Sequence, residues 1–134
     1  MYFFSISFYR TDIKEVEKDP AKLDRNEKMA DALEKAGIKI LFPQRDVDQS
    51  MPKSRIYKEE IEYLKQCDGV IAVLSDTRGV YLEIGYAKAL GKKIIGLKVD
   101  ETRPIPPESW AAQWFDFIAD DLDSLINYIK FNNL

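Results

Sequence analysis

The feature that most constrains the fold is an apolar run in the middle of the chain, Gly69 to Leu74, which reads Gly-Val-Ile-Ala-Val-Leu. A strand without polar alternation is buried on both faces, as in a parallel sheet covered by helices on both sides. Parallel strands need long crossover connections, and these are usually helices. The run therefore predicts an α/β domain with helical segments before and after it.

Short apolar runs and amphipathic segments alternate along the whole chain. Strands are expected at residues 2–7, 38–42, 69–74, 93–99 and 114–118, helices at 21–36, 55–67, 81–90 and 121–130, and loops at 44–54, 75–80 and 100–109. This order predicts a flavodoxin-like or Rossmann-like doubly wound sheet of about five parallel strands in the order 2-1-3-4-5. Ligands of such sheets bind at the carboxyl ends of the strands, where strands one and three meet. The site is thus expected at residues 5–12 and 75–81.

Composition narrows the class of protein further. The chain has 134 residues, which fits a single domain spanning 1–134, and its formal net charge of −3 gives no reason to expect nucleic acid as a partner. No apolar run approaches the roughly 18–20 residues of a membrane helix, and the apolar start lacks the basic segment and cleavage site of a signal peptide. Cys67 is the single cysteine, so no internal disulfide forms, and a cytoplasmic location is expected.

The sequence contains no histidine. This excludes Ser-His-Asp and Cys-His catalysis and any metal site with histidine ligands. Proton transfer must then use carboxylates, tyrosine, lysine, the single cysteine or water.

Glu83 is the most informative candidate for catalysis. It follows the loop after strand three and is expected in the first turn of the next helix, where the helix dipole favours an ionised carboxylate aimed into the ligand crevice. An ionised carboxylate suits attack on a sugar anomeric carbon, because it also stabilises the oxocarbenium-like transition state. Acidic residues are also common in first turns for dipole reasons alone, and position by itself favours that structural interpretation.

Several motifs together resemble the nucleoside 2-deoxyribosyltransferase family, which includes the 2′-deoxynucleoside 5′-monophosphate N-hydrolases. They are a helix ending in Cys67-Asp68, the apolar strand, a loop bearing Gly79, Glu83-Ile-Gly-Tyr-Ala, and Leu90-Gly-Lys before the next strand. The first strand, Tyr2-Phe-Phe-Ser-Ile-Ser, and Phe42-Pro43 are also similar to the family. The resemblance covers residues 1–104 and is tightest over 56–100.

The resemblance implies that Glu83 is a covalent nucleophile and that the sugar lies between the loops after strands one and three. It also implies association into a homodimer or higher homo-oligomer. Transferases of the family carry an aspartate six residues before the glutamate, where this chain has Thr77, and the N-hydrolases carry a small hydroxyl residue there. Asp76 lies one residue further back and is an alternative acid. Many relatives place an aspartate where this chain has Glu60, which otherwise belongs to a run of charges typical of a solvated helix face.

Other polar residues near the expected site are candidates for binding a phosphate or a sugar hydroxyl. They are Ser5, Ser7, Tyr9 and Arg10 after strand one, Gly79 in the loop after strand three, and the cations Arg45, Lys53, Arg55 and Arg78. An ordinary polar loop is the competing interpretation for the first group. Tyr81 is bulky where the family has a small residue, which would narrow the pocket. Trp110 and Trp114 are expected either to close the pocket or to lie in a subunit interface.

The sequence thus predicts an enzyme that cleaves the N-glycosidic bond of 2′-deoxynucleosides or their 5′-monophosphates through a deoxyribosyl-Glu83 intermediate. Water or a second base would resolve the intermediate, and Thr77 favours water. No metal or organic cofactor is implied, and the partner is a small-molecule deoxynucleoside or deoxynucleotide. Two alternatives remain because a fold does not fix a function: a non-catalytic nucleotide-binding or sensing module, and a signalling domain that cleaves NAD.

Overall fold

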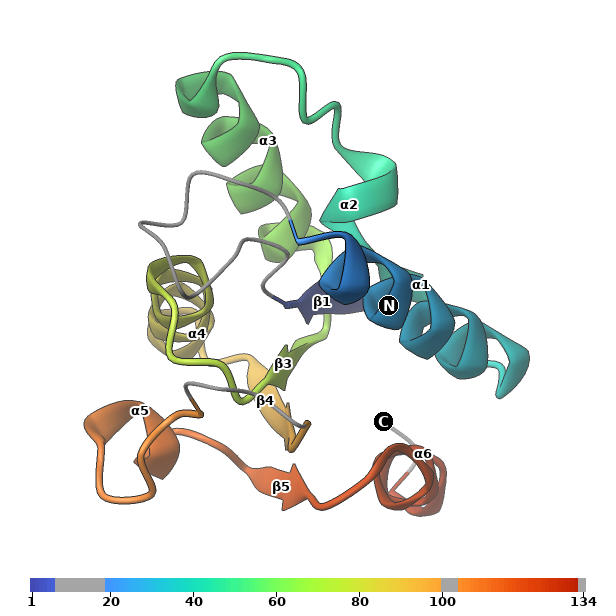
Figure 1. The fold of residues 1–134 in the computed structure, drawn as a ribbon. Helices are drawn as coiled ribbons and strands as arrows, with labels where there is room; N and C mark the ends of the chain where they lie inside the picture. Colours follow the sequence, from blue (N-terminus) through green and yellow to red (C-terminus); the bar gives the residue numbers. More distant parts are fainter. Residues whose placement is uncertain (7–18, 100–103, 133–134) are drawn as a thin grey trace.

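The computed structural model describes residues 1–6, 19–99 and 104–132, which form one parallel sheet flanked by helices (Figure 1). The strands are β1 (Tyr2–Ser5), β2 (Ile40–Leu41), β3 (Gly69–Val73), β4 (Lys93–Leu97) and β5 (Phe117–Ala119). The helices are α1 (Pro20–Lys35), α2 (Pro43–Asp46), α3 (Lys53–Gln66), α4 (Arg78–Ala89), α5 (Trp110–Gln113) and α6 (Leu122–Phe131).

The strand order is β2-β1-β3-β4-β5 with every pair parallel, which confirms the predicted doubly wound topology. β1 and β3 are neighbours in the sheet although α1, α2 and α3 separate them in sequence. Ser5 at the end of β1 lies opposite Ala72 of β3. The carboxyl ends of these two strands therefore meet at one edge of the sheet, as the sequence predicted.

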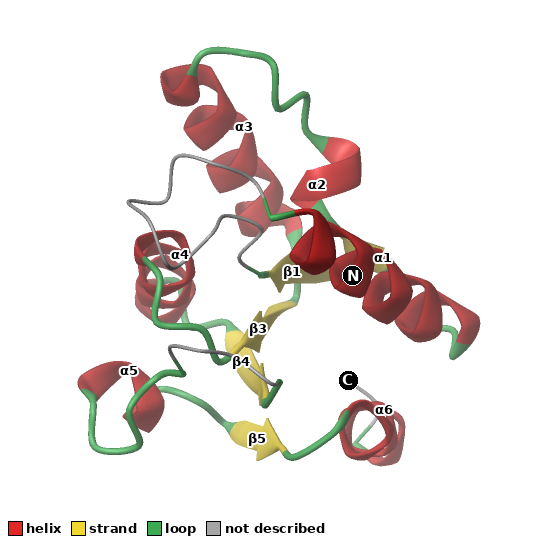
Figure 2. Cartoon of the chain, viewed as in Figure 1, coloured by secondary structure: helices red, strands yellow, loops and turns green. Residues whose placement is uncertain are grey.

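The core has two halves, one on each face of the sheet. Ala30 and Leu33 of α1 and Leu125 of α6 pack with the side chains of one face. Leu64 of α3 and Ile84 of α4 pack with those of the other. Figure 2 shows the sheet between these two helical layers, with α1 and α6 on one side and α3 and α4 on the other. The buried strand β3 contributes to both halves, as its unbroken apolar sequence requires.

Several element boundaries differ from the prediction. α4 begins at Arg78 and not at Tyr81, because Val80 joins Ile84 and Ala87 on the buried face of the helix despite the preceding Gly79. The expected loop at 44–54 contains the short helix α2, in which Asp46 accepts a hydrogen bond from the backbone N–H of Phe42 at 2.7 Å. The last strand lies at 117–119, after the unpredicted helix α5.

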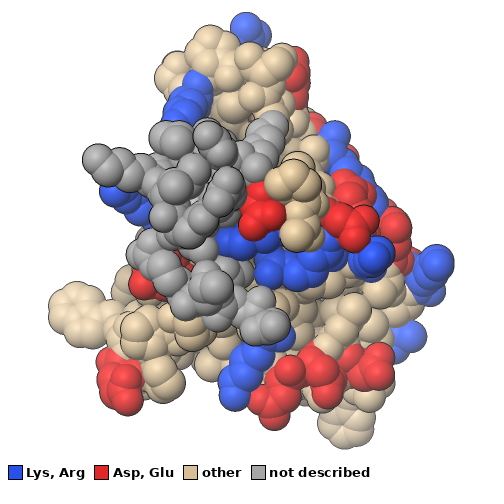
Figure 3. Space-filling model, viewed as in Figure 1, with Lys and Arg blue, Asp and Glu red and all other residues tan. Residues whose placement is uncertain are grey.

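The surface carries charges of both signs. In Figure 3 Lys and Arg side chains form a band across the middle of the molecule, with Asp and Glu side chains on either side of it. None of the helices that the structure describes is long and apolar enough to cross a membrane.

Candidate active site

Glu83 lies in the second turn of α4, at the edge of the sheet where β1 and β3 end. The predicted position in the first turn was wrong, because the helix starts at Arg78 and has no acidic residue in its first turn. The helix dipole acts mainly within the first turn. Its effect on the Glu83 carboxyl is therefore weaker than the sequence argument assumed, and the protonation of this group depends on its other neighbours.

The surroundings of Glu83 disfavour its charge. The residue as a whole is partly exposed, but its Oε2 atom is sealed from solvent and has no hydrogen-bond partner among the described residues. Burial raises the pKa of the Glu83 carboxyl well above its ordinary value, the nearby Glu60 carboxylate raises it further, and the Ser5 hydroxyl opposes the rise. These surroundings oppose the ionised, non-titrating Glu83 that the sequence predicted.

Glu60 of α3 is the second carboxyl of the site. Burial raises its pKa to about 7, against a smaller opposing effect of a hydrogen bond from the Gln49 side chain. Its neighbour Glu62 is exposed and forms an ion pair with Lys65 at 3.1 Å, as a solvated helix face would. The acidic residues of α3 thus face different ways: Glu62 faces solvent, whereas Glu60 points inward towards α4. The negative charge of Glu60 disfavours the ionisation of Glu83, so each carboxyl of the pair binds a proton more tightly than an isolated glutamate does.

Two buried serine hydroxyls lie at the same edge of the sheet. Ser5 ends β1 and is 1% exposed, and Ser75 follows β3 and is fully buried. Neither Oγ atom has a hydrogen-bond partner among the residues described. Buried polar atoms are rarely left unpaired, and functional sites are where the exceptions occur. Ser5 was a predicted site residue, whereas Ser75 lies in the loop expected at the site but was not singled out, because serine is an ordinary loop residue.

The residues at the start of α4 lie beside this edge. Thr77 is the N-cap residue and is 5% exposed, yet its side chain makes no capping hydrogen bond. Arg78 is exposed in the first position of the helix, and Asp76 is partly buried and has interaction partners. A Cβ atom placed on Gly79 would meet no atom of the described residues within 4 Å. The structure therefore brings Thr77 and Gly79 to the predicted ligand crevice.

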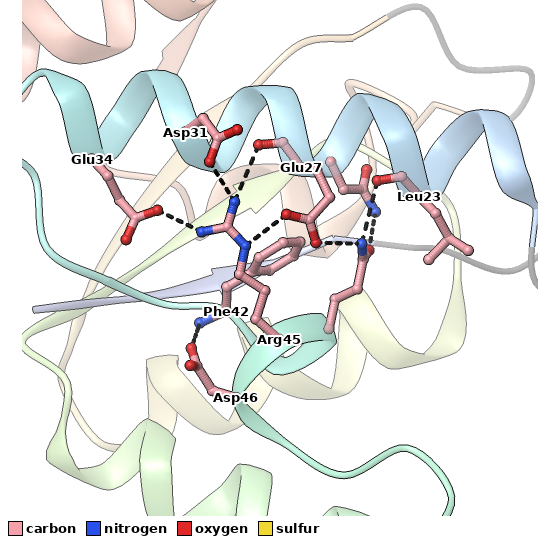
Figure 4. Close-up of polar contacts among 9 residues, drawn as sticks. Leu23, Glu27, Asp31, Glu34, Phe42, Arg45 and Asp46 are labelled. Carbon is pink, nitrogen blue, oxygen red and sulfur yellow. Dashed lines mark hydrogen bonds and ion pairs between the residues drawn. The ribbon is translucent and has the colours of Figure 1, made fainter.

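Arg45, a predicted phosphate ligand, instead forms ion pairs with carboxylates of α1. Its guanidinium donates to Glu27 at 2.6 Å, Asp31 at 2.6 Å and Glu34 at 2.5 Å, all on α1 (Figure 4). Three carboxylates already occupy its donors, so Arg45 holds α2 against α1 and is not available to a phosphate. Among the other predicted ligands, Arg55 and Lys53 are exposed in the first turn of α3.

Three of the predicted ligands, Ser7, Tyr9 and Arg10, lie outside the described residues. Tyr81 lines a groove between α4 and α5 together with Trp110 and Trp114. Trp110 is 84% exposed at the rim of that groove. Glu83 is not part of its lining, so this groove is separate from the carboxyl pair.

Comparison with known proteins agrees with the fold. The sequence model of the family described as nucleoside 2-deoxyribosyltransferase matches residues 16–128, which include Glu60, Thr77 and Glu83. None of the curated proteins matches the chain. The family match covers most of the chain, and this protein therefore belongs to the nucleoside 2-deoxyribosyltransferase family, whose members are enzymes that act on nucleosides.

Solved structures show the same fold at low sequence identity. A 2-deoxyribosyltransferase from Bacillus psychrosaccharolyticus superposes with a TM-score of 0.71 at 16% identity, covering 95% of this chain and 90% of that one. A conserved protein from Enterococcus faecalis V583 gives 0.77 at 16% identity, covering 98% and 97%. A CMP N-glycosidase from Clostridium botulinum gives 0.58 at 19% identity, covering 97% and 99%.

Proposed function

We propose that this enzyme cleaves the N-glycosidic bond of 2′-deoxynucleosides or their 5′-monophosphates, with Glu83 as the nucleophile and Glu60 as the proton donor. The observation that carries the proposal is the pair of partly buried carboxyls on α3 and α4, with Glu83 at the carboxyl edge of β1 and β3, in a chain of this family. Neither member of the pair has a structural partner of opposite charge that would explain its burial among the described contacts. Carboxyls with raised pKa values in a cleft are typical of catalytic sites.

The proposed reaction has two steps in which the pair exchanges roles. In the reactive state Glu83 is ionised and Glu60 holds a proton. A Glu83 oxygen forms a bond to C1′ while the C1′–N bond breaks, and the electrons and the Glu60 proton go to the leaving base. Glu60, now ionised, then removes a proton from water, and the water oxygen displaces Glu83 from C1′. A second base in place of water would give transfer.

Burial supports the separate roles of Glu83 as nucleophile and Glu60 as proton donor. In the ligand-free protein burial and the Glu60 charge both raise the pKa of Glu83 and so disfavour its ionised form. Positive charge developing at C1′ stabilises the ionised form of Glu83 and moves the proton to Glu60, where the leaving base needs it. In a site of low dielectric constant the attraction between carboxylate and sugar cation is stronger than in water.

Thr77 supports hydrolysis of nucleotides in particular. Its hydroxyl makes no capping hydrogen bond to α4, and no described residue crowds Gly79, so the hydroxyl and the first N–H groups of the helix could bind the 5′-phosphate of a substrate. A cytoplasmic location and assembly into homo-oligomers remain part of the proposal.

Chromatographic detection of free base tests the proposal directly. The protein is incubated with each deoxynucleoside and deoxynucleoside 5′-monophosphate, with and without a second base. Release is expected from at least one substrate, and Glu83→Gln is expected to abolish it. Glu62→Gln on the exposed face of α3 is the matched control and is expected to leave the rate unchanged. Absence of release from every substrate by the folded protein would disprove the proposed activity, and nicotinamide release from NAD would replace it.

A further inference from the structure

The Gln49 side chain connects the segment after α2 to the second carboxyl of the site. Its Nε2 atom donates to the backbone carbonyl oxygens of Pro43 at 3.1 Å and of Val47 at 3.3 Å. The same side chain acts as a hydrogen-bond donor to the Glu60 carboxyl on α3. Val47 is 3% exposed, so a buried side chain anchors the segment that carries Gln49. The amide is therefore held between α2 and α3.

The two carbonyl contacts fix the orientation of the Gln49 amide. A side-chain amide has an NH₂ end that donates and a carbonyl end that accepts, and a half-turn exchanges the two ends. After such a turn the Gln49 oxygen would face the carbonyl oxygens of Pro43 and Val47, with no proton between them. That orientation loses both hydrogen bonds and is disfavoured. Gln49 thus presents its donor end, and a donor favours the ionised form of the Glu60 carboxyl.

A fixed donor matters at Glu60 because the proposed reaction changes the charge of this residue. Glu60 begins as a neutral acid and becomes a carboxylate when its proton passes to the leaving base. Burial opposes that charge, and the Gln49 hydrogen bond acts in the other direction. A donor that is already in place stabilises the developing charge without any reorganisation during the reaction.

Building on the proposed function, we propose that Gln49 is a positioning residue for the proton transfer: its amide, fixed by the carbonyls of α2, orients the Glu60 carboxyl and stabilises its ionised form. In this step the O–H bond of Glu60 breaks, the proton forms an N–H bond on the leaving base, and the electron pair stays on the Glu60 oxygen. Gln49 touches neither the sugar nor the base in this scheme and acts through Glu60 alone.

The first test follows base release against pH in the unmodified protein and in Gln49→Met, which has similar length but no donor. Without the donor Glu60 keeps its proton to higher pH. The decline of activity above about pH 7 is therefore expected to move upward by about 0.5–1 pH unit. On the plateau below the decline, kcat is expected to fall about three- to tenfold because the acid gives up its proton less readily. KM should stay within about twofold.

A second glutamine of the same short helix provides the matched control. Gln44 also donates through Nε2, to the Leu23 carbonyl at 3.3 Å and to Glu27 at 3.0 Å, but both partners belong to α1. Gln44→Met removes a comparable pair of hydrogen bonds and is expected to leave the pH of the decline unchanged. Gln49→Ala removes the donor without placing a long apolar group against the carbonyls, and it should give the same shift as Gln49→Met. Thermal unfolding verifies that each variant is folded.

The second test needs no substrate. The carboxyl carbon of Glu60 is titrated by NMR and assigned by the loss of its signal in Glu60→Gln. Among the described residues Glu83 on α4 is the carboxyl coupled to Glu60, and Tyr57 and Tyr63 are the titratable side chains one turn away on α3. The comparison is made in a Glu83→Gln background, where Glu60 titrates without that coupling. Gln49→Met is expected to raise the Glu60 pKa by about 0.5–1 unit there.

The outcomes separate this inference from the proposed function. An upward shift in both tests with the Gln49 variants, and none with Gln44→Met, supports the inference. An unchanged or lower Glu60 pKa in the NMR titration would overturn it, as would a lower rate without any change in the pH of the decline. In each of these cases base release by the unmodified protein would leave the proposed function intact. Absence of base release from every substrate would overturn both.

Discussion

Replacing Glu60 with glutamine tests the carboxyl pair without assuming any substrate. Glutamine has nearly the same shape and can accept the same hydrogen bond from Gln49, but it never ionises. The unmodified protein must ionise Glu60 at a site that disfavours charge, since burial raises the pKa of Glu60 from 4.5 to about 7. Glu60→Gln should therefore be more stable than the unmodified protein at a pH where Glu60 would be charged.

The sign and size of the effect follow from proton linkage. A raised carboxyl pKa means that the folded protein binds a proton more tightly than the unfolded chain does, so the stabilising contribution is present below about pH 4.5 and is lost as the pH rises to about 7. A shift of this size corresponds to about 3 kcal/mol at most. For a domain of this length that equals roughly 10 °C in the melting temperature.

The assay is thermal or urea unfolding of both proteins at several pH values across this range. The stability of Glu60→Gln relative to the unmodified protein is expected to be small near pH 4.5 and to grow until about pH 7 or 8. Glu62→Gln on the exposed face of the same helix is expected to stay within about 0.5 kcal/mol throughout. A difference that is independent of pH, or one that favours the unmodified protein above pH 7, would refute the burial of the Glu60 carboxyl.

Further substitutions test other parts of the site and fold. Glu60→Gln is expected to lower kcat about 10²–10⁴-fold and to remove the decline of activity above about pH 7, measured by base release across pH. Arg45→Met should cost about 1 kcal/mol in urea unfolding, less at high salt, because its three ion pairs are partly exposed. Gly96→Ala should destabilise by about 1–3 kcal/mol, because the added Cβ would lie 2.8 Å from the Phe115 ring. Ser5→Ala should raise the melting temperature of the ligand-free protein, because it removes an unpaired buried hydroxyl.

The sheet topology was predictable because its signals are local and repeated. The apolar run at 69–74 marks a strand buried on both faces, and the alternation of strands and helices then leaves few topologies. Boundaries were harder wherever tertiary contacts override propensity. Gly79 discourages a helix in isolation, but the burial of Val80 on the α4 face extends the helix to Arg78.

For the candidate site too, local motifs were predictable from the sequence and tertiary contacts were not. Glu83 was found from its motif and its place after strand three, but its protonation depends on Glu60, which lies 23 residues earlier in sequence on another helix. Periodicity could not distinguish Glu60 from Glu62, because the direction of each side chain depends on how α3 packs against α4. Arg45 was misread for a similar reason, since its three carboxylate partners belong to a helix that its own segment meets only after folding.

The energetics of the site argue for function over a purely structural role. A structural residue should stabilise the protein, as Arg45 does through its three ion pairs, and its removal should lower stability. Glu60, Glu83 and Ser5 have the opposite character, because each places a charge or an unpaired polar atom in a buried position. Groups of this kind persist when a ligand or a reaction uses them. Substitutions of these three residues that raise stability and lower activity together would show that the residues take part in the reaction. A substitution that lowers stability without affecting activity would show a purely structural role.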